Sequence, residues 1–167
     1  MDIIDIIKTR RSIRKFTSVP ISEEMVEKVL EAGRWAPSGL NNQPWRFAVI
    51  TDAGLKQKIS ELTHYSKTVL AAHVLVPVFL DTETSYHREK DIQGLGACLE
   101  NMLLEAHSLG LGAVWLGEII KSGEQIKQIL GLGHGLELMA VVALGHPDEK
   151  PKDVKRKALK DLVVFRK

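Results

Sequence analysis

The stretch Asp91-Ile-Gln-Gly-Leu-Gly-Ala-Cys-Leu-Glu-Asn-Met-Leu-Leu-Glu-Ala-His-Ser-Leu109 has the clearest helical periodicity in the chain. Its apolar positions follow one another at alternating spacings of three and one, which places them on one face of an α-helix. These positions are Leu95, Cys98, Leu99, Met102, Leu103 and Ala106. We therefore expect a long amphipathic helix here, ended by the glycines at 110 and 112.

Shorter elements are expected on both sides of this helix. Before it we expect an opening helix with Ile3, Ile6 and Ile7 on one face, and a second helix that Ser22 caps and that stops before Pro37. These are followed by a strand over 45–50, a short helix over 53–62 and a strand within 70–80. Pro77 indicates that this last strand lies at an edge or holds a bulge. After the long helix we expect a strand over 113–116, a helix through Leu130 that starts at a capping box of Ser122 and Gln125, and a strand over 136–144. Strands and helices without a regular βαβ alternation predict an α+β fold.

Length and composition indicate one globular domain over residues 1–167. The hydrophobic share of 44% and the charged share of 26% are close to the globular average and argue against disorder. The longest uncharged run, Thr68 to Leu80, is shorter than the roughly 20 residues that span a bilayer. The start of the chain has no basic segment followed by an apolar core, so we expect no signal peptide and a cytoplasmic protein.

The charges are nearly balanced overall but unevenly placed. The 23 basic and 21 acidic residues give a net charge of +2, which argues against a nucleic-acid or membrane partner. Basic residues gather between Lys8 and Lys15 and again in the tail over 147–167. Two such clusters at opposite ends of a neutral chain suit a small anionic ligand better than a polyanion.

The common catalytic and nucleotide motifs are absent from the sequence. Gly94-Leu-Gly96 lies inside the expected long helix, and Glu118 stands where a P-loop needs its lysine. The six histidines have no metal-ligand spacing, and no Gly-x-Ser-x-Gly elbow is present. Cys98 fits the apolar face of the helix as a small buried hydrophobe. We therefore expect no metal site and no catalytic side chain, so an enzyme of this kind would use an organic cofactor.

Two polar segments remain that suit a ligand. Arg10-Arg-Ser-Ile-Arg-Lys-Phe16 combines guanidinium groups and a hydroxyl, which bind phosphate oxygens well, although a solvated basic turn would have the same composition. Trp35-Ala-Pro-Ser-Gly-Leu-Asn-Asn-Gln-Pro-Trp45 offers amides that both donate and accept, as the edge of a flat heterocycle requires. An ordinary helix-to-strand loop is the alternative interpretation of this second segment.

Four segments, in this order, resemble the nitroreductase family of FMN-dependent oxidoreductases. They are Arg10-Arg-Ser-Ile-Arg-Lys-Phe16, Ala36-Pro-Ser-Gly-x-Asn-x-Gln-Pro-Trp45, Gly110-Leu-Gly-Ala-Val-Trp-Leu-Gly117 and Ala143-Leu-Gly-His-Pro147. The resemblance runs from about Ile4 to Phe165. It implies a nitroreductase-like FMN-binding fold, with a central, mostly antiparallel sheet flanked by helices. It also implies a homodimer with FMN at the subunit interface, and a C-terminal extension over 147–167 that packs on the partner subunit.

The resemblance also implies the residues that bind FMN. Arg10, Ser12 and Arg14 would contact its phosphate, ribityl chain and pyrimidine edge, and Arg11 would contribute backbone or side-chain contacts. Pro37, Ser38, Gly39 and Asn41 would come from the other subunit and line the flavin, with Gln43 as a further neighbour. Leu116 and Gly117 would lie against the flavin ring, with a backbone N–H of Gly117 or Glu118 facing N5. Arg156, in preference to Lys155, would be the last phosphate contact. Between residues 50 and 91 only Thr63, Tyr65 and Lys67 are candidates.

The implied function is two-electron hydride transfer from NADH or NADPH, through FMN, to nitroaromatics, quinones or similar small acceptors. No side chain of the protein has to act as nucleophile or general acid, which agrees with the absent motifs. Glu118 stands where many relatives have a second glycine, so its carboxylate would restrict the acceptor. Two alternatives stay open: a flavin-binding carrier or sensor without turnover, and a basic nucleic-acid-binding module.

Overall fold

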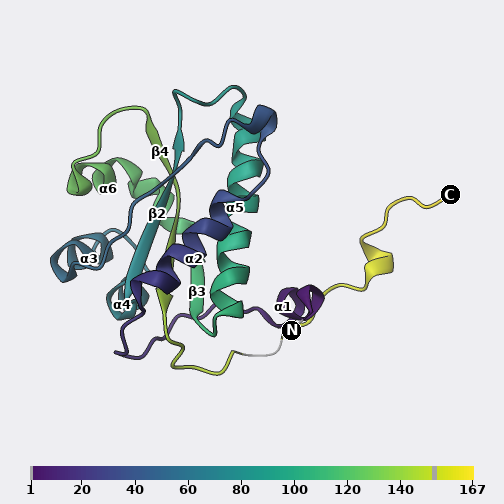
Figure 1. The fold of residues 1–167 in the computed structure, drawn as a ribbon, viewed down its shortest axis with the longest axis horizontal. Helices are drawn as coiled ribbons and strands as arrows, with labels where there is room; N and C mark the ends of the chain where they lie inside the picture. Colours follow the sequence, from purple (N-terminus) through teal and green to yellow (C-terminus); the bar gives the residue numbers. More distant parts are fainter. Residues whose placement is uncertain (1, 152–153) are drawn as a thin grey trace.

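The computed structural model describes residues 2–151 and 154–167 (Figure 1). Its centre is a four-stranded antiparallel sheet in the order β1-β2-β4-β3. The strands are β1 (Trp45–Phe47), β2 (Val74–Asp81), β3 (Gly112–Leu116) and β4 (Leu136–Gly145). Helices cover both faces, with α2 and α5 on one side and α3, α4 and α6 on the other. The expected α+β class is confirmed.

The α-helices are α1 (Ile3–Thr9), α2 (Glu23–Arg34), α3 (Ala53–Ser60), α4 (Ser66–Ala71), α5 (Arg88–Ser108) and α6 (Gly123–Leu130). Three 3-10 turns accompany them: η1 (Gly39–Asn41), η2 (Glu118–Ser122) and η3 (Leu159–Asp161). Ser22 caps α2 as expected, since its side chain accepts a hydrogen bond from the Met25 backbone nitrogen. The long helix also forms as predicted, and it ends before Gly110, which has a φ of 75°.

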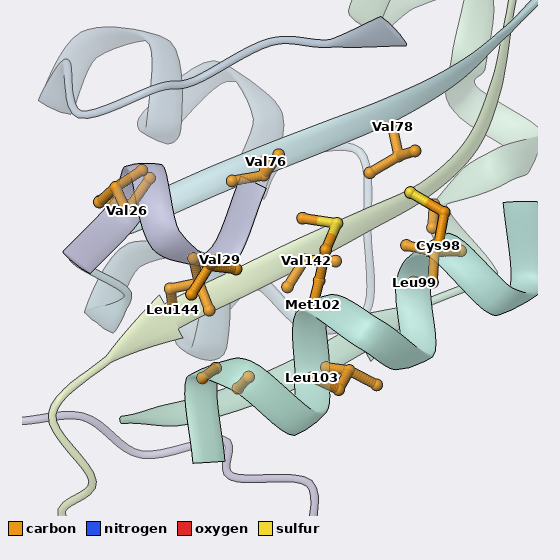
Figure 2. Close-up of a cluster of buried hydrophobic side chains, with 14 of the residues drawn as sticks. Val26, Val29, Val76, Val78, Cys98, Leu99, Met102, Leu103, Val142 and Leu144 are labelled. Carbon is orange, nitrogen blue, oxygen red and sulfur yellow. The ribbon is translucent and has the colours of Figure 1, made fainter. Parts of the chain in front are cut away.

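The apolar face of α5 packs against α2 and one face of the sheet (Figure 2). Alternate residues of β2 point to opposite faces, so Val76 and Val78 join this cluster while Leu75 and Phe79 join the one beneath α3, α4 and α6. Both clusters together bury every residue of β2 except Asp81. A strand covered on both faces is apolar throughout, which explains why its sequence lacks alternation.

The strand expected within 70–80 is β2, and of the two alternatives at Pro77 the bulge is the one that fits: the strand is central, and its register shifts between Val78 and Phe79. The structure corrects two local expectations. The strand β1 is shorter than the expected 45–50. The capping box at Ser122 does not form, because the Ser122 hydroxyl donates to the Leu62 carbonyl at 3.0 Å.

Two apolar regions stay uncovered in the single chain. In α1 no residue is buried, and Ile3 is 68% exposed, so the described residues leave most of the apolar face of this helix uncovered. The tail extends away from the body of the molecule in Figure 1, and Phe165 is 78% exposed there. Exposed apolar side chains on this scale are typical of surfaces that another molecule covers.

Candidate functional site

A basic pocket of about 460 Å³ forms between the N-terminal segment and the start of the tail. Its lining residues are Arg10, Arg11, Ser12, Arg14, Glu149, Lys150, Pro151, Val154 and Arg156. The structure thus brings together the four predicted residues of the first basic cluster and Arg156 of the second. Lys155, the alternative to Arg156, does not line the pocket. Among the described lining residues five cations face one carboxylate, so the pocket favours an anionic ligand.

Backbone pairing and two buried side chains hold the basic segment in place. The Ile13 nitrogen donates to the Ala113 carbonyl of β3 at 2.9 Å, and Phe16 bridges to Pro147. Ile13 and Phe16 are both buried, which leaves the neighbouring polar residues on the pocket side. Glycines make this close packing possible, since a Cβ at Gly112 would lie 2.7 Å from the Ile13 side chain.

Arg11 and Arg10 differ in how many of their donors are already bonded to other residues of the chain. Arg11 donates from Nη1 to the carbonyls of Lys8 and Arg10, at 2.7 and 2.8 Å, and so caps the end of α1. Arg10 lies with Nε 3.4 Å from a carboxylate oxygen of Glu100, and this buried nitrogen makes no hydrogen bond to the described residues. The two Nη groups of Arg10 make no hydrogen bond to the described residues either, so these donors remain available for a ligand.

The positive field of these arginines reaches His107 at the end of α5. Burial lowers the pKa of His107, and the nearby charges of Arg10 and Arg11 lower it further. The ring is also within hydrogen-bond distance of Thr9, with 2.8 Å between Nε2 and Oγ1. The neutral form of His107 is thus favoured near Arg10 and Arg11, where an additional cation is disfavoured.

The Glu149 carboxylate accepts hydrogen bonds from two backbone nitrogens of the basic segment. One of its carboxylate oxygens accepts from the Arg14 nitrogen at 2.5 Å and from the Lys15 nitrogen at 3.2 Å. Two successive N–H groups that converge on one oxygen form an anion-binding concavity. Nothing in the local sequence around Glu149 indicates this contact, because it joins residues that are far apart in the chain.

A loop that follows α2 contains Pro37, Ser38, Gly39 and Asn41. It lies against the N-terminal part of α5. Its backbone approaches that helix closely, since a Cβ at Gly94 would lie 3.3 Å from the Pro37 carbonyl oxygen. Pro37 and Asn41 are exposed, and Ser38 and Gly39 are half-buried. Ser38 accepts a hydrogen bond from the Gln43 nitrogen at 3.0 Å, which closes the loop.

This loop does not line the basic pocket of its own chain. The Pro37 carbonyl of the loop lies beside Gly94 of α5, whereas Arg10 pairs with Glu100, further along the same helix. Among the described residues, those that line the pocket come from the basic segment and the start of the tail, and none comes from the loop.

Gly117 and Glu118 form a third polar region where β3 ends. Leu116 is buried in the core beneath α6, so only its backbone is available to a ligand. Gly117 is exposed and lines an apolar pocket of about 400 Å³ together with Trp115 and Ile120. Glu118 pairs with Lys121 and accepts a hydrogen bond from the Thr63 hydroxyl at 2.8 Å.

The surroundings of Glu118 keep its carboxylate charged. The hydrogen bond from Lys121, followed by that from Thr63, lowers its pKa to about 2. Thr63, one of the three candidates from residues 50–91, therefore contacts Glu118 directly. Tyr65, the second candidate, is hydrogen-bonded to Thr63, since its nitrogen donates to the Thr63 hydroxyl at 3.2 Å. Lys67 is exposed in α4 and makes no hydrogen bond or ion pair within the described ranges. Lys121 was not predicted, since its pairing depends on the turn of η2.

Comparison with known proteins assigns the fold to a family. The family model described as "Nitroreductase family" matches residues 7–75 and 61–146. A Methanothermobacter thermautotrophicus protein assigned as an NADH dehydrogenase/NAD(P)H nitroreductase is 35% identical over 153 residues, which cover 90% of this chain and 80% of that protein. The chain belongs to the nitroreductase family. The predicted resemblance is thereby confirmed, together with the nitroreductase fold.

Solved structures of the nitroreductase family match the whole fold. A Desulfovibrio desulfuricans protein assigned as a nitroreductase, in complex with FMN, has a TM-score of 0.95 and 43% identity, covering 100% of this chain and 98% of that one. The NADPH:FMN oxidoreductase from Vibrio harveyi, complexed with NAD+, has a TM-score of 0.89 and 27% identity, covering 99% of this chain and 77% of that one.

Residues 2–151 and 154–167 contain neither a metal-binding cluster nor a membrane-spanning helix. In this part of the chain no three side chains of His, Cys, Asp or Glu gather so as to hold a metal ion. None of its helices combines the length and the apolar character that crossing a bilayer requires. Cys98 is fully buried in the cluster of Figure 2, and burial raises the pKa of its thiol to about 12.

Proposed function

We propose that this nitroreductase-family protein binds FMN in the basic pocket and uses NADH or NADPH to reduce nitroaromatics, quinones or similar small acceptors. The observation that carries the proposal is the meeting of Arg10, Ser12, Arg14 and Arg156 in one pocket. These side chains come from opposite ends of a chain whose fold matches an FMN-bound structure over its whole length. The proposed reaction needs a nicotinamide donor, so we expect it to take place in the cytoplasm.

The residues of the pocket fit a phosphate group. Arg10 has a buried Nε without a hydrogen-bond partner among the described residues, and Ser12 adds a hydroxyl. The nitrogens of Arg14 and Lys15 already hold a carboxylate oxygen of Glu149, which has the charge and acceptor character of a phosphate oxygen. Charge-assisted hydrogen bonds of this kind are the strong ones in anion recognition. In the proposed complex, Arg10, Ser12 and Arg156 bind the phosphate and Arg11 keeps the end of α1 in place.

When bound, FMN supplies the two-electron hydride chemistry that no side chain here provides. Gly117 is exposed at the end of β3, and among the described residues a Cβ there would have only the Trp115 ring nitrogen within 4 Å, at 3.9 Å. This open backbone is where we propose that a flat ring lies. Glu118 stays charged beside it, so neutral or cationic acceptors would be favoured over anionic ones.

We further propose that two copies of the chain share each site. The loop with Ser38 and Gly39 does not line the basic pocket of its own chain, and the resemblance implies that both contact one FMN, so we propose that the loop comes from a second copy. The uncovered isoleucines of α1 and the exposed tail, with Leu162 and Phe165, provide apolar surface for such a dimer. In this dimer the extension over 147–167 packs on the partner subunit.

Complementation between two variants tests this arrangement. In Arg10→Ala the phosphate contact is lost, and in Ser38→Trp the loop is blocked, so neither homodimer should retain FMN. A mixed dimer has one site with an intact Arg10 from one copy and an intact Ser38 from the other. Co-expression with two different affinity tags isolates the mixed dimer, and its flavin content is read from absorption.

The expected result is one FMN per mixed dimer and almost none in either homodimer. If each site were built from one chain, the mixed dimer would bind no better than the two homodimers, and the shared site would be disproved. Reoxidation of the bound flavin by a nitroaromatic or a quinone then separates an enzyme from a carrier or sensor, since only the enzyme turns over.

A further inference from the structure

Asp91 is a buried carboxylate that lies outside the basic pocket. It occupies the first turn of α5 and is only 1% exposed. Its partners are neutral donors on two different segments. One oxygen accepts from the Ser85 hydroxyl at 2.6 Å and from the backbone nitrogens of Tyr86 and His87 at 3.2 Å each. The other oxygen accepts from the Asn42 side-chain nitrogen at 2.8 Å.

These hydrogen bonds keep the carboxylate ionised. Burial by itself raises the pKa of Asp91, but the hydrogen bonds from Ser85, Asn42 and the backbone of His87 and Tyr86 outweigh it and lower the pKa below its usual value. A buried anion without its donors would be costly, so each donor is held firmly in turn. Because Asn42 donates to this carboxylate, Asp91 holds the loop segment to which Asn42 belongs.

Asn42 belongs to a loop with an unusual backbone. Leu40, Asn41 and Gln43 have φ values of 54°, 55° and 47°, in the left-handed region that side chains other than glycine rarely adopt. Residues in such conformations persist only where their surroundings hold them. Asn42 lies between them, and its amide nitrogen reaches the Thr84 carbonyl at 3.2 Å as well as Asp91.

Packing adds to this attachment. The Tyr86 ring covers Gly39 so closely that a Cβ there would lie 1.9 Å from the phenolic oxygen. Tyr86 is itself fixed by its backbone hydrogen bond to Asp91. One carboxylate thus controls both the side-chain contact at Asn42 and the ring that lies over Gly39.

We propose that Asp91 is a positioning residue for the flavin-lining loop: through Asn42 it holds residues 38–43 in the shape that presents Ser38, Gly39 and Asn41 to the cofactor. This inference rests on the proposed function for its consequence in FMN binding. Its structural part, the control of the loop by Asp91, is measurable in the protein without FMN.

Asp91→Asn is the informative substitution because it keeps the shape of the side chain. Three donors face one oxygen and only Asn42 faces the other, so the amide oxygen stays with the three and its NH2 group turns toward Asn42. Two donors then face each other. If the Asn42 amide turned its oxygen toward the new NH2 group, its own NH2 group would leave the Thr84 carbonyl, so the attachment of the loop is weakened in either orientation. Ser85→Ala is the matched control, since it removes a hydrogen bond from the same carboxylate without touching the loop.

The experiment uses the full chain in two forms. In the FMN-free protein, hydrogen exchange is measured at the backbone amides of Asn41, Asn42 and Gln43, which are hydrogen-bonded within the loop. In the FMN titration, Kd is measured by quenching of flavin fluorescence. Asn42→Ala, and Asn42→Ala combined with Asp91→Asn, complete a double-mutant cycle.

We expect Asp91→Asn to speed exchange in the loop and to raise Kd roughly tenfold, the scale of one lost charge-assisted hydrogen bond. The double variant should bind no more weakly than the weaker single variant, and Ser85→Ala should leave Kd within about twofold of the wild type because Asn42 keeps its hydrogen bonds to Asp91 and to the Thr84 carbonyl. Unchanged loop exchange in Asp91→Asn, or an equal effect of Ser85→Ala, would overturn the inference. A wild-type protein that binds no FMN would instead overturn the proposed function, while the exchange data still decide whether Asp91 holds the loop.

Discussion

A carboxylate oxygen of Glu149 lies 2.5 Å from the backbone nitrogen of Arg14, inside the pocket proposed for the FMN phosphate. The phosphate would have to share or take over this nitrogen, and it would meet the negative charge of Glu149. Glu149→Gln should therefore strengthen FMN binding several-fold, and the gain should shrink at high salt because the effect is electrostatic. A fluorescence titration at low and high ionic strength measures it.

Asp148→Asn is the control for this effect. It removes a neighbouring negative charge whose side chain does not line the pocket. If both substitutions strengthen binding equally, the general charge of the segment is responsible and the carboxylate of Glu149 has no particular place in the site.

Arg10→Ala should weaken FMN binding by roughly ten- to a hundredfold, the usual cost of a lost hydrogen bond between charged groups. Arg10 is singled out because its buried Nε has no hydrogen-bond partner in the described part of the chain. Lys8→Ala is the matched control, a nearby cation that does not line the pocket. Full flavin content of Arg10→Ala after gel filtration would contradict the assignment.

Glu118→Gln should change the choice of acceptor. The charged carboxylate beside Gly117 repels an anionic acceptor, so its removal should raise kcat/KM for a nitrobenzoate more than for neutral nitrobenzene. The comparison of the two acceptors is its own control, because a general effect on the flavin would change both alike. An equal change for both acceptors would place Glu118 away from the acceptor.

Glu118 should also contribute to stability in a pH-dependent way. Its pKa in the folded protein, about 2, lies below the ordinary value of 4.5, so the contribution is complete above pH 4.5 and is lost as the pH falls toward about 2. The Tm of the wild type should therefore fall more steeply over this range than the Tm of Glu118→Gln. Parallel curves would mean that the pairing with Lys121 and Thr63 contributes nothing to the folded state.

Met102→Ala should destabilise the fold without removing the site. Met102 is fully buried between α5 and α2, where a Cβ at Gly33 would already lie 2.8 Å from its side chain. Truncation there leaves a cavity, and we expect a loss of about 2–5 kcal/mol in the free energy of unfolding by urea. Leu70→Ala, at a position that is 45% exposed, should cost far less.

The sequence was sufficient to predict those structural features that depend on residues close together in the chain. The spacing of Leu95, Cys98, Leu99 and Met102 identified α5, and the Ser22 cap was predicted because it involves only the next turn. The capping box at Ser122 failed for the opposite reason. Its hydroxyl donates to Leu62, a partner 60 residues away that no local pattern reveals.

The candidate site follows the same rule. The resemblance identified Arg10, Ser12, Arg14 and Arg156, and the structure brings them into one pocket, but whether they bind FMN stays a prediction. Glu149 on the Arg14 nitrogen was not predicted, nor was the link from Asp91 to Asn42, because both join segments far apart in the sequence. Leu116 was expected beside the flavin, yet its side chain is buried in the core.

The most direct test is an absorption spectrum of the freshly purified protein, supplemented with FMN and kept anaerobic, before and after addition of NADH or NADPH. We expect bound flavin whose absorption bands bleach with at least one of the two donors and return when a nitroaromatic or a quinone is added. Bound flavin that neither donor bleaches would contradict the proposed NAD(P)H-dependent reaction. A protein that remains colourless and takes up no added FMN would contradict the whole account of the basic pocket.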